Sequence, residues 1–421
     1  MNHQSLQWLQ QRGYPLNRMA ILKEAKNKIL SLRKAKDLNT RNLRFQRCRP
    51  NLYFIVEDLG LELSLYGDDK ISSDFTRIVY HILKKHSGIS LKTFQLDLAS
   101  PCSYIGVEEL ILATTSMIPT YNFPLSLLSV KNVNSIRYLS LSFCAFHPTV
   151  KFGCFRSLKR LHLHFLSITG DELGHLLSDS FALEQLELSF CNNIKCLKVP
   201  RVLLRLSYLE VVFCSRLQVI ESEAPNLSSF CFRWIHHVRI SLGPALHVKK
   251  LEISGSGAFH HGQLPTIMPS LQTLTINSLS KKMTSTPSLH SKFHQLKYLN
   301  IRIPGETHGP VYDYFSLALF LDASPCLETL ILRIHVPESH LKHGLFSGDP
   351  SNLREMPRHG NEKLKRVQID GFYPAKSLLE LARHLLGSAT SLGCLALGTN
   401  YCSCKFGDKD FGKCYLLAIG T

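Results

Sequence analysis

Long hydrophobic runs are absent from this 421-residue sequence. No stretch approaches the roughly 18 uninterrupted apolar residues that a membrane helix needs, although 44% of the residues are hydrophobic. The first segment, residues 1–22, also lacks the apolar core of a secretory signal. We therefore expect a soluble intracellular protein, cytoplasmic or nuclear, with no membrane partner.

The sequence also lacks the signature motifs of common enzymes. It has no G-x-x-x-x-G-K-[ST] phosphate loop, no G-x-S-x-G elbow and no H-E-x-x-H zinc motif. Gly255-Ser256-Gly257, with His260 and His261 nearby, could suggest a Ser/His or phosphate site, but Gly-Ser-Gly after a strand is typical of a turn. We expect a protein that is not an enzyme and that uses no cofactor.

Paired C-x2-C knuckles are missing as well, although the chain has 13 cysteines. A long, leucine-rich chain without a secretion signal does not need disulfides. The one dense group is Cys394, Cys402, Cys404 and Cys414. Its C-x7-C-x-C-x9-C spacing differs from that of structural zinc sites, which favours free thiols and no bound metal.

Acidic residues are scarce at the start of the chain. Of a net charge of +17, residues 1–50 supply +10, from 12 Lys and Arg against Glu24 and Asp37. Such a segment can be a nucleic-acid arm, a nuclear-localisation patch, an organelle presequence or a solvated amphipathic helix. Apolar residues at three- and four-residue steps in Met19–Ala35 favour the amphipathic helix over a nucleic-acid arm.

What the sequence does contain is a repeated leucine pattern. The form L-x-x-L-x-L-x-x-C, with Ile, Val or Asn in some slots, begins at Ile136, Leu183, Leu206 and Leu392. This is the leucine-rich-repeat consensus, in which a short strand buries alternate leucines. The Cys or Asn that follows turns inward to bond the backbone of the loop.

The shorter pattern L-x-x-L-x-L extends through most of the chain. Its first residues, here called anchors, are Leu91, Val107, Ile136, Leu158, Leu183, Leu206, Leu227, Val248, Leu271, Leu296, Leu327, Leu364 and Leu392. Between Ile136 and Leu296 the anchors are 22, 25, 23, 21, 21, 23 and 25 residues apart, within the range of roughly 20–29 typical of these repeats. The later steps of 31, 37 and 28 residues indicate insertions between strands.

Helical patterns precede several of the strands. They cover residues 78–83, 171–177, 314–321 and 378–386, and Gly88 and Gly387 stand where left-handed caps are common. Between Leu206 and Leu296 the helical periodicity fades and prolines punctuate the connections, which predicts short turns or extended returns there.

Strand, loop and helix in this order predict an α/β fold, a leucine-rich-repeat solenoid. We expect a horseshoe with a parallel concave sheet and a convex side of mixed helices and extended segments. The expected domains are a basic N-terminal segment at 1–54, the solenoid at 55–401 and a C-terminal tail at 402–421.

An unknown protein is expected to bind the concave sheet, because residues between the buried leucines point away from the core. The polar and aromatic residues at these positions are Arg160, His162, His164, Glu187, Tyr208, Glu210, Arg233, Tyr298, Arg302, Arg333 and Arg366. Arg and Tyr often dominate interface energetics, whereas a solvated polar face is the alternative. His162 and His164 share a strand face without a third ligand at a fixed offset, so no metal is expected there.

The stretches Ser135–Thr149, Leu158–Phe232 and Leu364–Leu397 resemble plant F-box proteins with leucine-rich repeats, including their FBD-type C-terminal region. The resemblance extends from about residue 43 to about residue 400. Phe45–Phe54 resembles the segment that closes the F-box, but Met1–Thr40 contains no Leu-Pro opening helix. The F-box is therefore truncated or replaced.

In that family the F-box binds a Skp-type adaptor of a cullin-RING ubiquitin ligase, and the repeats capture the protein to be ubiquitylated. The resemblance implies a substrate-recognition subunit. The alternative is a stand-alone repeat protein that binds a partner without coupling it to ubiquitin ligation. A third possibility, nucleic-acid binding through the basic N-terminus, predicts steep loss of affinity with salt.

Overall fold

The computed structural model describes the repeats and leaves aside the N-terminal segment and several connections. The described residues are 50–55, 79–82, 91–97, 122–123, 134–148, 155–233, 238–243, 247–254, 264–277, 292–303, 313–334, 348–355, 361–373, 375–398 and 415–417.

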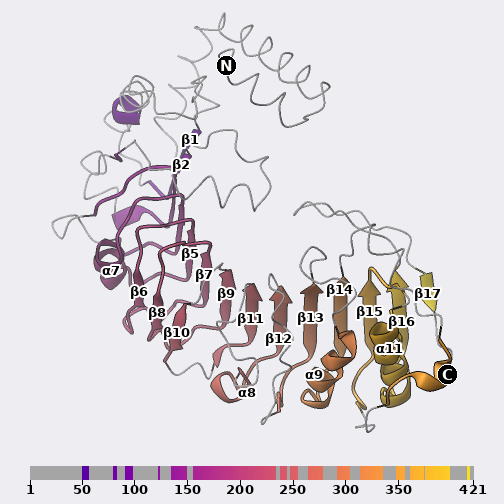
Figure 1. Cartoon of the computed structure of the whole chain (residues 1–421). Helices are drawn as coiled ribbons and strands as arrows, with labels where there is room; N and C mark the ends of the chain where they lie inside the picture. The colour runs from indigo at the N-terminus through magenta and orange to yellow at the C-terminus, as the bar shows by residue number, and fades with distance from the viewer. Residues whose placement is uncertain are drawn as a thin grey trace, which may run out of the picture.

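The described residues form one large sheet of 14 strands (Figure 1). Its strands, in spatial order, are β1 (Asn51–Ile55), β2 (Thr93–Asp97), β3 (Tyr138–Ser142), β4 (Arg160–His164), β5 (Gln185–Ser189), β7 (Tyr208–Val212), β9 (Ser229–Arg233), β11 (Lys250–Ser254), β12 (Thr273–Asn277), β13 (Tyr298–Ile303), β14 (Thr329–Ile334), β15 (Arg366–Asp370), β16 (Cys394–Gly398) and β17 (Tyr415–Leu417). All neighbours pair in parallel except β17, which pairs antiparallel with β16. The predicted parallel sheet is confirmed.

Each described anchor lies two residues before a strand, as the repeat pattern predicts. Leu158 precedes β4 and Leu183 precedes β5, for example, and both side chains are fully buried. Val107 lies outside the described residues, and the strands on either side of it in the chain, β2 and β3, pair directly with each other. The sheet extends from Asn51 to Leu417, beyond both ends of the 55–401 range expected for the solenoid.

The core lies on one side of the sheet because the second and fourth residues of each strand point to the same face. In β4 these are Leu161 and Leu163, and in β5 they are Leu186 and Leu188, all at most 1% exposed. The parallel strands are in register, so Leu161 pairs with Leu186 and Leu163 with Leu188. The buried leucines therefore form continuous ladders along the solenoid.

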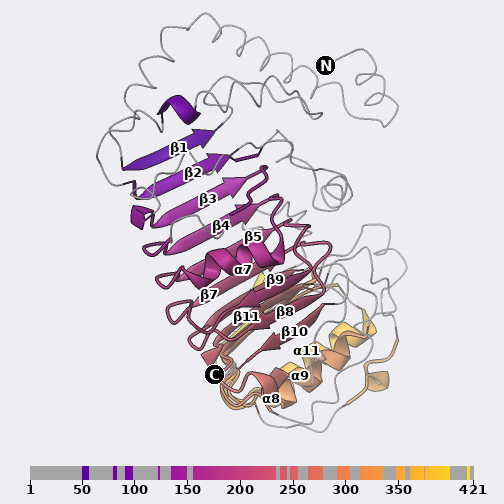
Figure 2. The same cartoon turned by 90° about the vertical axis from the view of Figure 1, so that its left-hand side faces the viewer.

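A second sheet and several helices lie on one side of the large sheet, which we call the covered side (Figures 1 and 2). They are β6 (Cys196–Val199), β8 (Val219–Ser222) and β10 (Arg239–Leu242), which form a parallel three-stranded sheet, and α7 (Gly170–Ser178), α8 (Leu264–Ile267), η6 (Tyr314–Leu317), α9 (Ala318–Asp322), η7 (Pro350–Asn352) and α11 (Lys376–Ser388). Between Leu206 and Leu296, β8 and β10 are extended returns as predicted, whereas α8 is a short helix where none was expected. Neighbouring helices need more room than the spacing of about 4.8 Å between neighbouring strands. The side that carries the helices is therefore longer, and the sheet forms the shorter, concave side of the solenoid.

Local sequence explains the helix starts. α7 begins with a capping box in which the Thr169 hydroxyl accepts from the Glu172 N–H, and the Glu172 carboxylate accepts from the Thr169 N–H at 2.8 Å. Asp171 and Glu172 stand in its first turn, where they oppose the helix dipole. The prediction of a cap at Gly387 was wrong, because α11 continues through this residue to Ser388.

The cysteines that follow three of the strands are buried and free: Cys144, Cys191 and Cys214. The sulfur of Cys191 donates to the carbonyl of Leu163 at 3.5 Å and of Ser189 at 3.6 Å. Both acceptors belong to strands. Cys191 therefore bonds to carbonyls near the strand ends, and not to the loop carbonyls that we expected from the sequence.

Four phenylalanines form a stack along the edge of the sheet where β3, β4, β5 and β7 end. Phe143, Phe165, Phe190 and Phe213 each come directly after a strand and have left-handed φ values of 56°, 47°, 55° and 51°. Successive ring centroids are 4.6, 4.3 and 5.5 Å apart, close to the spacing of the strands. Bulky residues rarely adopt this backbone conformation, so the stacked rings accompany a strained turn that repeats in each coil.

Glycine takes the equivalent position after β15. Gly371 has a φ of +76°, and a Cβ there would lie 1.9 Å from the carbonyl oxygen of Ile334. A side chain cannot fit at this point without moving the neighbouring strand.

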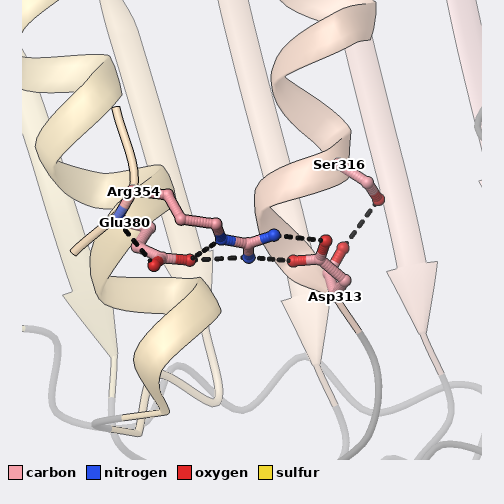
Figure 3. A network of polar contacts seen from close by, with 4 residues as sticks. All are labelled: Asp313, Ser316, Arg354 and Glu380. Carbon is pink, nitrogen blue, oxygen red and sulfur yellow. Dashed lines mark hydrogen bonds and ion pairs between the residues drawn. The ribbon is translucent and has the colours of Figure 1, made fainter. Parts of the chain in front are cut away.

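Arg354 ties the segment between β14 and β15 to the helices of the covered side (Figure 3). Its Nε and one terminal nitrogen donate to Glu380 in α11 at 2.9 and 2.7 Å, and its backbone N–H donates to the same carboxylate at 2.9 Å. The terminal nitrogens also donate to Asp313, just before η6, at 2.6 and 3.0 Å. The guanidinium lies over the ring of Phe315, with its carbon 5.1 Å from the centroid. Glu380 is fully buried, so Arg354 supplies the neutralising charge.

Candidate functional site

Three rows of side chains cover the concave face. The first, third and fifth residues of each strand point away from the core, and the register of the parallel strands aligns them across the sheet. Residues so aligned stand about 4.8 Å from their neighbours in the next strand. The rows therefore make a continuous polar surface, which we call the concave face.

All the candidate binding residues proposed from the sequence stand in these rows. The first row holds Arg160, Tyr208, Tyr298 and Arg366, the third-position row holds His162, Glu187 and Glu210, and the fifth-position row holds His164, Arg233, Arg302 and Arg333. Their role in binding stays a prediction.

The histidines of β4 differ in their surroundings. The Nδ1 of His162 is 3.4 Å from the hydroxyl of Ser140 on the neighbouring strand. His164 lies edge-on to the rings of Phe165 and Phe190, with centroids 4.6 and 5.7 Å away. Burial, together with the nearby His162, lowers the pKa of His164 to about 4. His164 is therefore neutral at physiological pH and belongs to the aromatic edge as much as to the polar face.

At the centre of the face, hydrogen bonds hold the carboxylates. The Tyr208 hydroxyl donates to Glu210 on the same strand. Arg233 forms an ion pair of 2.6 Å with Glu252 in β11. Burial raises the pKa of the neighbouring thiol of Cys231 to about 12, with Glu252 adding to the effect.

Farther along, arginines follow one another in the fifth-position row. Arg302 in β13 stands in register with Arg333 in β14 on one side and with Asn277 in β12 on the other. The Nε of Arg333 lies 3.4 Å from a carboxylate oxygen of Asp370, and that carboxylate also accepts from Gln368 at 3.0 Å.

Sequence reasoning missed the carboxylates that pair with Arg233 and Arg333, and the amides that donate to those carboxylates: Glu252, Asp370, Asn277 and Gln368. Each stands at the third or fifth position of a strand, so the repeat pattern itself could have found them. Which of them pair depends on cross-strand register, and that information is not contained in any single repeat.

The concave face is divided by charge. From β9 to β16 its rows hold five cations and two carboxylates, a net charge of +3: Arg233, Lys250, Arg302, Arg333, Arg366, Glu252 and Asp370. From β2 to β7 they hold one cation and three carboxylates, a net charge of −2 with neutral histidines: Arg160, Asp97, Glu187 and Glu210.

Two cavities among the described residues lie away from this face. One of about 390 Å³ is lined by Lys195, Ser215, Arg216 and Gln218, in loops that lead to β6 and β8. Among the described residues, no three His, Cys, Asp or Glu side chains are arranged to hold a metal ion. In the same part of the chain, every helix is too short or too polar to cross a membrane.

Stacked parallel coils, inward leucine ladders and an open polar sheet define a leucine-rich-repeat scaffold, a class of protein that binds other proteins and is typically not enzymatic. A family profile described as "At1g61320/AtMIF1, LRR domain" matches residues 82–419. The chain therefore belongs to this leucine-rich-repeat family.

Comparison with individual proteins adds little to the family assignment. No curated protein matches the sequence. Among solved structures, a chain from "Crystal structure of Rad7 and Elc1 complex in yeast" matches 78% of this chain and 96% of its own length, at 13% sequence identity and a TM-score of 0.22.

Proposed function

We propose that this protein captures a partner protein on its concave face and serves as the substrate-recognition subunit of a cullin-RING ubiquitin ligase. The single observation that carries the binding proposal is the exposed, charge-divided surface of the 13 parallel strands, from β1 to β16, whose rows have a regular spacing. The coupling to a ligase rests on the sequence resemblance to F-box proteins and on Phe45–Phe54 in particular.

The concave face is tested by charge reversal at Arg302 and Arg333. A partner is first identified by affinity purification from the source tissue, and its binding is then measured with the purified protein. The double variant should bind at least 1–2 kcal/mol more weakly, the scale of an interface hot spot, without unfolding the solenoid. Arg239→Glu is the matched control, because Arg239 is exposed on the second sheet. Undiminished binding in the Arg302/Arg333 double variant and in an Arg160/Glu187 double variant would move the site to the convex side or the loops.

The ligase coupling is tested with a purified Skp-type adaptor. Residues 1–49 lie outside the described part of the chain, and the opening F-box helix is not recognisable in their sequence. The isolated N-terminal segment should therefore bind the adaptor weakly or not at all. The ligase proposal instead requires that the full-length protein form a stoichiometric complex with the adaptor. If deletion of residues 1–51 abolishes that complex, a divergent F-box is present.

The second candidate function is a stand-alone repeat protein that binds the same partner without delivering it for ubiquitylation. The observation that favours it is the missing Leu-Pro opening helix in Met1–Thr40. Failure of the full-length protein to co-purify with the adaptor, with partner binding intact, supports this alternative.

A further inference from the structure

Arg302 occupies an unusual position in the basic half of the concave face. It stands in register with Arg333 on the adjacent strand, both in the fifth-position row. Like charges directly opposite each other on neighbouring strands destabilise a sheet. Folding alone therefore gives no reason for a second arginine at this place.

The neighbouring arginines have ion-pair partners, whereas Arg302 has none among the described residues. Arg233 pairs with Glu252 at 2.6 Å, and Arg333 pairs with Asp370 at 3.4 Å. Within the described residues, no carboxylate lies within ion-pair distance of Arg302. Burial lowers the pKa of Arg302, and the nearby Arg333 lowers it further. Among the described residues, Glu252 acts on Arg302 only from beyond ion-pair distance, so one positive charge in this row has no direct acidic partner.

Polar atoms without partners surround this charge. The Nε of Arg302, the Oδ1 of Asn300 and the Oδ1 of Asn277 are buried and make no hydrogen bond within the described part of the molecule. Buried polar groups in proteins are almost always paired, and exceptions often mark a functional site. These atoms lie on two adjacent strands, β12 and β13.

The surroundings favour a macromolecule over a small ligand. Small ligands bind in enclosed cavities, whereas neither of the two most pronounced cavities of the described residues contains Arg302. Tyr298 and Ile331 stand on the same open face, in β13 and β14, and offer aromatic and aliphatic contact area. A single positive charge without a direct acidic partner matches one carboxylate better than a doubly charged phosphate.

We propose that Arg302, with Arg333 beside it, binds the carboxylate of an Asp or Glu residue in an extended segment of the partner protein. This inference rests on the proposed function, because it names the chemical group that the concave face recognises. An arginine fork can donate two parallel hydrogen bonds to one carboxylate, which gives geometric selectivity as well as attraction. The net charge of +3 over β9–β16 favours an acidic segment in this half of the face.

The test uses a phage-displayed library of random 12-residue peptides, selected on the full-length protein. Each selected peptide is synthesised and its affinity is measured for wild type, Arg302→Gln, Arg302→Lys, an Arg160→Ala/Glu187→Ala double variant and the control Arg239→Gln. Peptides that bind the basic residues 1–50 can be identified because none of these substitutions lowers their affinity. Thermal melting of each variant checks that it remains folded.

Peptides that bind the concave face should be rich in Asp and Glu and should lose at least tenfold in affinity with Arg302→Gln. Arg302→Lys should lose nearly as much, because lysine keeps the charge but not the fork. Arg239→Gln should change the affinity less than twofold. Replacing the critical Asp or Glu of the peptide by its amide should weaken binding to wild type by a similar factor, with little further loss on Arg302→Gln. That peptide substitution leaves the protein unaltered, so it decides the question even if Arg302→Gln does not fold.

Two results would overturn the inference, and they separate it from the proposed function. Peptides that are weakened by the Arg160/Glu187 substitutions but not by Arg302→Gln or by their own amide substitution would remove the carboxylate site and leave concave-face binding intact. No peptides, or only peptides insensitive to every concave-face substitution, would overturn both.

Discussion

Removal of the Arg354 side chain should loosen the C-terminal part of the solenoid. In Arg354→Met the buried carboxylate of Glu380 loses two hydrogen bonds from the guanidinium and keeps only the backbone N–H of residue 354. Breaking a buried ion pair from one side costs about 3–5 kcal/mol. Because Arg354 itself is half exposed, with 51% of its side-chain surface accessible, we expect the low end, about 3 kcal/mol.

The contribution of the second carboxylate should be much smaller. Asp313 is 47% exposed, and ion pairs between exposed groups contribute about 0.2–1 kcal/mol, so Asp313→Asn should cost about 0.5 kcal/mol. A double-mutant cycle of Arg354→Met with Glu380→Gln should give a coupling energy of at least about 1.5 kcal/mol, since residues that share a buried network are not additive.

Hydrogen exchange of α11 is the assay, because repeat proteins can open locally while the rest stays folded. Glu355→Gln is the matched control. Glu355 also joins the same segment to α11, through Arg383, but it is 71% exposed, so we expect a loss below about 0.5 kcal/mol. If both variants destabilise α11 equally, the reasoning from the burial of Glu380 is refuted.

Three further predictions concern the repeats. Leu161→Ala and Leu186→Ala should each destabilise the protein by about 2–5 kcal/mol in urea unfolding, and a loss below about 0.5 kcal/mol at both would contradict the packing of the leucine ladders. Cys144, Cys191 and Cys214 should react slowly with a polar thiol reagent, because all three are buried. Burial also raises the pKa of Cys144, and a hydrogen bond with Cys191 together with burial raises the pKa of Cys214. Rapid labelling of all three thiols in the native state would contradict this prediction. His164 has a pKa of about 4 when folded against about 6.5 when unfolded, so its contribution is complete above pH about 6.5 and is lost as the pH falls toward 4, by up to roughly 3 kcal/mol. Melting temperatures of wild type and His164→Gln between pH 4 and 7 should differ in slope, and parallel curves would argue against a buried neutral His164.

The strands could be predicted because one local signal specifies them. An anchor such as Leu183 followed by Leu186 and Leu188 fixes both the start of a strand and the face it buries. β1 was not predicted as a repeat because the position two residues before it is occupied by Arg49 and not by an apolar residue. Its assignment depends on pairing with β2, which is a tertiary fact.

The phenylalanine stack could have been recognised from the repeated position of phenylalanine in the sequence. Phe143, Phe165, Phe190 and Phe213 all follow the fourth residue of a strand, which faces the core, by two positions. The left-handed backbone at these residues could not be predicted, because phenylalanine does not favour it. The Arg354–Glu380 pair was equally out of reach, since its partners are 26 residues apart and belong to no repeat.

The rows of the concave face were predicted because they follow from strand alternation. Their pairing was not, because Arg233 lies in register with Ser254 while its guanidinium reaches Glu252, two positions earlier in the same strand. Such diagonal contacts depend on side-chain length and rotamer. A sequence pattern identifies the face, and only the structure identifies which arginine has no ion-pair partner among the described residues.

The division of charge along the concave face makes the two halves of the solenoid electrically different. A surface with a net charge of −2 from β2 to β7 and +3 from β9 to β16 is a dipole whose axis runs across the strands. A partner with its own charge asymmetry is rotated by such a field before contact, so encounters in the reversed orientation become rare. At physiological ionic strength the field extends about 8 Å, roughly the width of two strands, which confines this alignment to the last moments of approach.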